Sequence, residues 1–172
     1  FSSYELLGGF DNKTLETDQA LWDLSRKATD AEVRRILAEK AGAEALEALA
    51  GSKAGQVFLA ELDAYLASYG QRGNTCSLCT VTWIEDPSPV LKNLRDYIGR
   101  NDADPPQRLA TQSAEREAAL VKVRQRLEGY PEPVRGQFEF LLQAAQTGVV
   151  LSEDHGFWID FQSSHRVRMV LV

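Results

Sequence analysis

The chain has 172 residues, of which 44% are hydrophobic and 26% are charged, and its formal net charge is -6. This composition fits one globular domain with a buried core and excludes a disordered or fibrous chain. The acidic balance, with basic residues dispersed along the sequence, argues against a nucleic-acid partner, which needs clustered Lys and Arg. No apolar run approaches the roughly 18 residues that span a bilayer, so we expect no membrane partner and a cytoplasmic location.

Both ends of the sequence look cut. It opens at Phe1 without an initiator Met, and residues 169–172 are apolar, with no capping glycine and no polar tail. A helix that ended there would expose its last turn. We therefore expect residues 1–172 to be a single helical domain, a fragment of a larger multidomain chain.

Apolar residues recur at helical spacing through most of the first half of the chain. The spacing predicts a helix around residues 15–24, and the Thr29-x-x-Glu32 pattern is a possible capping box for a second helix. The boundary near residue 29 is therefore either a break between two helices or a kink. An Ala-rich helix over 43–50 is expected to end at Gly51 in the left-handed conformation. The apolar stripe after Lys53 predicts a helix that closes at Gly70.

The helical pattern breaks between residues 71 and 87. This segment holds two cysteines and a run of β-branched and aromatic residues. One Asp-Pro pair and one Ser-Pro pair then follow, at residues 86–89. Such a composition is typical of an irregular loop, with at most a short extended piece.

Four helices are predicted in the second half of the chain. Ser88 as cap with Pro89 starts one that ends at Gly99, and residues 107–127 form a long, charged and largely exposed helix. A third is expected to end at Gly148, and Ser152 is expected to cap a final one. The predicted fold is therefore all-α, with about seven helices in an irregular bundle.

Cys76 and Cys79 have the spacing of a zinc or redox pair. A structural zinc ion needs four ligands, and the remaining candidates, His155 and His165, are separated by nine residues, too far for a zinc-finger pair. A redox dithiol would belong to a βαβ unit, which is absent. We expect two reduced cysteines packed in a loop and no metal site.

His155 follows Glu153 and Asp154, whose charges favour the positive end of a helix dipole and so need no catalytic explanation. Helical spacing places His155 on one face with Trp158 and Ile159, a mixed setting that suits a group titrating near neutral pH. A lone histidine is more often structural, so both readings stay open. No Walker A, Gly-rich phosphate loop, nucleophile elbow or HExxH motif occurs, and we expect no cofactor on this segment.

Several motifs occur in a fixed order: YGQRG at 69–73, WIEDP at 83–87, REA at 116–118, and SEDHGFWID at 152–160 followed by Arg166. Together they resemble the middle region of phosphoenolpyruvate-utilising enzymes, especially the branch with rifampicin phosphotransferase and phenylphosphate synthase. The likeness covers most of the chain.

This resemblance implies a three-part enzyme. An ATP-grasp domain would bind ATP and Mg²⁺, a swivelling domain would carry a phosphohistidine, and a helical domain would hold a small hydroxyl-bearing acceptor. ATP would be split to AMP and phosphate while one phosphoryl group travels through the histidine to the acceptor. This chain resembles the helical acceptor-binding or linker domain only, so its expected partners are its own ATP-grasp and swivelling domains. Neither His155 nor His165 lies in a phosphohistidine motif.

Within that role, His155 is the candidate general base, and the other candidates would bind substrate. Aromatic side chains would form the walls of an acceptor pocket, and one or two arginines would steady the phosphoryl charge. Core packing or a salt bridge is the ordinary alternative for each. The candidate substrate-binding residues are Arg72, Trp83, Phe157, Trp158, Phe161 and Arg166.

A second function stays open: a non-catalytic helical protein-interaction module that docks through the exposed helix over 115–128. The parent reading frame separates the two hypotheses. The enzyme hypothesis requires an ATP-grasp domain upstream and a histidine-bearing domain downstream.

Overall fold

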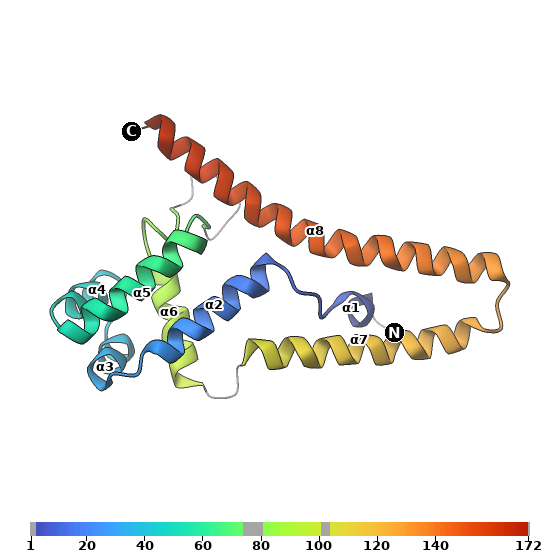
Figure 1. Ribbon diagram of the computed structural model, residues 1–172, viewed down its shortest axis with the longest axis horizontal. Coiled ribbons are helices and arrows are strands. Elements are labelled where there is room, and N and C mark those ends of the chain that lie inside the picture. Colours follow the sequence, from blue (N-terminus) through green and yellow to red (C-terminus); the bar gives the residue numbers. More distant parts are fainter. Residues whose placement is uncertain (1–2, 74–80, 101–103, 172) are drawn as a thin grey trace.

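The structure is a computed structural model that describes the backbone of residues 3–73, 81–100 and 104–171, and the side chains within these ranges except those of residues 3–4, 164–169 and 171. The described residues form eight α-helices (Figure 1), which confirms the all-α prediction. In chain order they are α1 (Ser3–Leu7), α2 (Lys13–Lys27), α3 (Ala31–Glu39), α4 (Gly42–Ala50), α5 (Lys53–Tyr69), α6 (Ser88–Gly99), α7 (Pro105–Leu127) and α8 (Glu132–Leu171).

Short polar side chains set the starts of the early helices. The carboxylate of Asp30 accepts hydrogen bonds from the second and third amides of α3, so Asp30 caps this helix. Ser52 caps α5 in the same way. The sequence pattern had suggested Thr29 as the cap of α3, and this is wrong. Gly51 and Gly70 follow α4 and α5 in the right-handed region, so the left-handed ending expected at Gly51 is wrong.

Helices α2 to α6 form a compact body around one hydrophobic core, at the left of Figure 1. Its centre consists of aliphatic side chains that are almost completely buried, and each of the five helices contributes to it. Their burial is the main source of stability for these helices, since short helices are marginal on their own. The most buried large side chains are Leu37, Leu49, Leu62, Leu94, Val33 and Val90.

Helices α7 and α8 form a long splayed hairpin that extends from the body, with α1 between its arms (Figure 1). The buried guanidinium of Arg116 on α7 holds the segment after α1 in place. It donates to the carbonyl oxygens of Gly8 (2.9 Å) and Gly9 (2.8 Å) and lies 3.9 Å from the centre of the Phe10 ring. Gly9 has a positive φ of 73°, and a Cβ there would meet the backbone of Ser113 at 2.5 Å.

Helix α8 is one continuous helix of 40 residues, so the predicted end at Gly148 and the predicted start at Ser152 are wrong. A single internal glycine costs a helix only about 1 kcal/mol, and no proline follows it here. In spite of this length, no helix in the described part of the chain is apolar enough over a sufficient stretch to cross a membrane.

The segment between α5 and α6 confirms the predicted irregular loop. Its described part holds a single antiparallel bridge, between Gly73 and Thr82, and no strand. Two backbone hydrogen bonds, from Trp83 to Arg72 and from Ile84 to Gly70, extend the pairing towards the end of α5. Cys76 and Cys79 lie outside the described residues.

Candidate functional site

The last third of α8 crosses the beginning of α2 and the end of α5, and this crossing is the candidate site (Figure 1). Two hydrogen bonds fix it: the backbone N–H of Lys13 donates to Asp154 Oδ1, and the hydroxyl of Thr14 donates to Glu153 Oε2, both at 2.8 Å. Asp154 thus satisfies a first-turn amide of α2. The two acidic residues do meet the positive end of a helix, but it is the end of α2 and not of their own helix.

Aromatic rings gather at the crossing, around the buried side chain of Phe157, which is 5% exposed. The Phe157 ring lies 6.3 Å from that of Tyr69 on α5, 5.5 Å from Trp158 and 6.4 Å from Phe161, measured between centroids. Together with Trp83, these four rings are called the aromatic cluster below. The cluster contains all four aromatic residues that the sequence proposed for an acceptor pocket.

Arg72 joins the loop side of the cluster to α8. Its guanidinium carbon lies 5.9 Å from the ring centres of both Trp83 and Phe157. The backbone pairing of Arg72 with Trp83, at 2.9 Å, places the two side chains together. Within the described residues, no hydrogen bond or ion pair engages this guanidinium, so its five N–H donors stay available.

Three buried polar atoms, on α5 and in the segment between α5 and α6, also have no hydrogen-bond partner among the described residues. They are the hydroxyl oxygen of Tyr65, the indole nitrogen of Trp83 and the side-chain oxygen of Gln71. Burial raises the pKa of the Tyr65 phenol far above its ordinary value. Buried polar groups are nearly always paired, so these three atoms are a feature that a bound polar molecule would explain.

Asp160 is a site residue that sequence reasoning missed. It lies one helical turn after Phe157 and is partly buried. Burial raises the pKa of its carboxyl group, while the positive charge of Arg72 acts in the opposite direction. Its spacing of three residues from Phe157 was the available signal, since residues at this spacing share a helix face.

Comparison with known proteins gives the family. Residues 3–153 match the family described as the rifampicin phosphotransferase fourth domain. This chain belongs to that family. It is therefore a phosphotransferase-related domain, as its motifs predicted.

Two relatives place this fourth domain within much longer chains. The chain is 45% identical over 166 residues to chondramide synthase cmdD of Chondromyces crocatus, covering 96% of this chain but 4% of that protein. It is 28% identical over 172 residues to the uncharacterized phosphotransferase YvkC of Bacillus subtilis (strain 168), covering 98% of this chain and 20% of that protein. The fourth domain thus spans a small part of each of these two relatives.

His155 lies on the exposed side of α8, one helical turn before Trp158. Its side chain is exposed, and at about 100° per residue it points roughly 200° around α8 from Phe157, which is buried. It occupies the interior of a long helix and not the first turn that the sequence suggested. Its role as a general base stays a prediction. Arg166 lies on α8, but its side chain is outside the described set.

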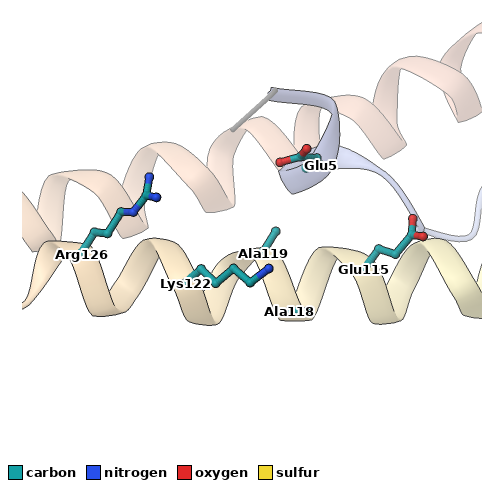
Figure 2. A pocket seen from close by; sticks show the side chains of 6 residues that line it. All are labelled: Glu5, Glu115, Ala118, Ala119, Lys122 and Arg126. Carbon is teal, nitrogen blue, oxygen red and sulfur yellow. The ribbon is translucent and has the colours of Figure 1, made fainter.

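The largest cavity described for the fourth domain lies elsewhere, between α1 and α7 (Figure 2), with a volume of about 660 Å³. Two acidic side chains, two basic side chains and two alanines line it: Glu5, Glu115, Lys122, Arg126, Ala118 and Ala119. It includes part of the exposed helix that the sequence offered as a docking surface, and none of the predicted substrate-binding residues. Among the described residues, no three His, Cys, Asp or Glu side chains are placed to hold a metal ion.

Proposed function

We propose that this chain is the acceptor-binding and linker domain of an ATP-dependent phosphotransferase. The parent enzyme converts ATP and a small hydroxyl-bearing acceptor into the phosphorylated acceptor, AMP and phosphate, through a phosphohistidine on another domain. The observation that carries this proposal is the position of Arg72, whose guanidinium lies against two rings of the aromatic cluster and has no hydrogen-bond partner among the described residues. Family membership and the phosphotransferase relative support the same reaction class.

In this proposal the acceptor packs its apolar body against the aromatic cluster, which offers large surfaces at fixed positions. Trp158, 47% exposed, forms the outer wall, and Phe157 forms the buried floor. Arg72 donates to the oxygens of the transferring phosphoryl group, where a charged donor lowers the energy of the transition state. The family resemblance makes Arg166 a second donor to the same phosphoryl group in this proposal.

ATP and Mg²⁺ belong to the ATP-grasp domain of the parent enzyme in this proposal. The described part of this chain offers no acidic cluster suited to Mg²⁺. The partners of the domain are therefore the ATP-grasp and swivelling domains of the same polypeptide, together with the acceptor.

The test uses the full-length polypeptide that contains this chain, with ATP and with rifampicin or phenol as probe acceptors. We expect acceptor-dependent release of AMP, and we expect Arg72→Ala to lower kcat/KM by about a hundredfold, the size of a lost transition-state donor. Arg35→Ala is the matched control, because Arg35 lies on the exposed side of α3 and pairs only with its helix neighbour Glu39. A polypeptide that forms neither AMP nor phosphohistidine from ATP would contradict the proposal.

The second candidate, a non-catalytic interaction module, is favoured by one observation. One face of α8 carries several large apolar side chains that are exposed. They lie within an arc of about 100° around the helix axis and so form one apolar stripe. They are Phe140, Leu141, Leu151, Trp158 and Ile159. This function gains if the parent polypeptide encodes no ATP-grasp or histidine domain, and if the helix over 115–128 or this face of α8 binds a protein partner.

A further inference from the structure

We propose that Asp160, rather than His155, accepts the proton of the acceptor hydroxyl during phosphoryl transfer. This inference rests on the proposed function and assigns a catalytic residue within its acceptor pocket.

The first argument is position along α8. Asp160 is about 60° around the helix from Phe157, so the two side chains share a face. On this face the Phe157 ring lies 6.3 Å from that of Tyr69 on α5, measured between centroids. Phe157 is buried in the aromatic cluster, and Asp160 is partly buried beside it. His155 is directed to the opposite side of the same helix and is exposed. A hydroxyl group of a molecule bound against Phe157 therefore lies nearer to Asp160 than to His155.

The second argument is the absence of a competing partner. Within the described residues, Asp160 makes no hydrogen bond and no ion pair. Arg72 acts on it electrostatically without forming a salt bridge. Among the described residues, neither this carboxylate nor the Arg72 guanidinium has a hydrogen-bond or ion-pair partner, which suits a third group placed between them.

The third argument is the chemistry of the surrounding groups. Donors dominate the crossing: the guanidinium of Arg72, the unpaired indole N–H of Trp83 and the unpaired hydroxyl of Tyr65. These donors suit phosphoryl oxygens and a developing alkoxide. Asp160 adds a carboxylate to these donors, and burial makes this carboxylate more basic than that of an exposed aspartate. The other charged or titratable groups at the crossing are Lys13, Glu16, Tyr69, Glu153 and Asp154.

The resulting step is balanced without a redox partner. The O–H bond of the acceptor breaks and its proton moves to a carboxylate oxygen of Asp160. The freed electron pair forms the new O–P bond with the phosphoryl group of the phosphohistidine. The P–N bond breaks, and its electron pair returns to the ring nitrogen of that histidine. The proton on Asp160 then passes to solvent.

The experiment compares Asp160→Asn with His155→Gln in the full-length polypeptide, with rifampicin and phenol as probe acceptors. We expect Asp160→Asn to lower kcat for acceptor phosphorylation by about a hundredfold or more, the effect of losing a general base. KM for the acceptor and the yield of phosphohistidine from ATP should stay near wild type. We expect Asp160→Glu to recover part of the rate, and the acidic limb of the pH profile of kcat to disappear in Asp160→Asn. His155→Gln should remain within about threefold of wild type.

Two outcomes would overturn the inference alone: wild-type kcat in Asp160→Asn, or a larger loss of kcat in His155→Gln than in Asp160→Asn. Equal losses of phosphohistidine and of acceptor phosphorylation in Asp160→Asn would also overturn it, since they would indicate a structural role. If the wild-type polypeptide transfers nothing from ATP to histidine or to either acceptor, the proposed function itself is wrong, and this inference falls with it.

Discussion

The body and the hairpin of this domain are built from the same kind of helix, but they are stabilised in different ways. In the body, α2 to α6 share one core whose central side chains, such as Leu94, are completely buried. In the hairpin, most side chains are exposed, and α7 and α8 are joined by α1 and by the ion pair between Arg124 and Glu139. Burial therefore fixes the body, while individual ties fix the hairpin.

The largest expected difference between the two regions concerns apolar side chains. Leu94→Ala should lower the free energy of unfolding by about 3 kcal/mol, because it leaves a cavity in the core. Phe140→Ala in the hairpin removes a larger side chain that is 70% exposed, and it should cost less than about 0.5 kcal/mol. Urea denaturation of both variants measures this. Comparable losses would show that the apolar stripe of α8 is buried against something in solution.

Glycine substitutions give a second contrast, of opposite sign in the two regions. In Gly55→Ala the new Cβ would lie 2.0 Å from the carbonyl oxygen of Leu49, so the backbones of α4 and α5 must separate. We expect the free energy of unfolding to fall by about 2 kcal/mol. In Gly148→Ala the new Cβ meets nothing within 4 Å. The higher helix propensity of alanine should raise the free energy of unfolding by about 0.5–1 kcal/mol. Thermal denaturation tests both signs, and destabilisation by Gly148→Ala would contradict a continuous α8.

The smallest expected effect is that of the ion pair in the hairpin. The guanidinium of Arg124 lowers the pKa of Glu139 below its ordinary value of 4.5. The stabilisation that this ion pair gives the fold is therefore present above pH 4.5 and is lost as the pH falls through the lowered pKa of Glu139. Both side chains are about half exposed, so Arg124→Gln should cost less than about 1 kcal/mol at neutral pH. The NMR titration of Glu139 in both proteins checks the direction, and an unchanged pKa in the variant would refute it.

The body is also the region that the sequence predicts well. Apolar side chains at helical spacing determine which face is buried, and Gly51 and Gly70 mark helix ends even though their conformation is right-handed. The break of α8 was predicted wrongly because Gly148 and Ser152 are the usual residues of a helix end. In the described structure a Cβ at Gly148 would meet nothing within 4 Å and Ser152 is exposed, and neither fact is visible in the local sequence.

The site was predicted in its residue types but not in its geometry. Trp83 and Phe157 were singled out, and both contact Arg72. The sequence grouped His155 with Trp158 and Ile159 on one face of α8, and this face is exposed. Phe157 and Asp160 lie on the more buried face. Helical phase must be measured from a buried residue such as Phe157, and the sequence alone did not show that this ring is buried.

The continuity of α8 also has a mechanical consequence. A straight helix of 40 residues is about 60 Å long and behaves as a rod, because bending it would strain many backbone hydrogen bonds. One end of this rod is the hairpin turn near residues 128–131, and the other end carries Phe157 and Asp160. A sideways force on the turn would therefore be transmitted along α8 to the crossing at Asp154, which lies one helical turn before Phe157.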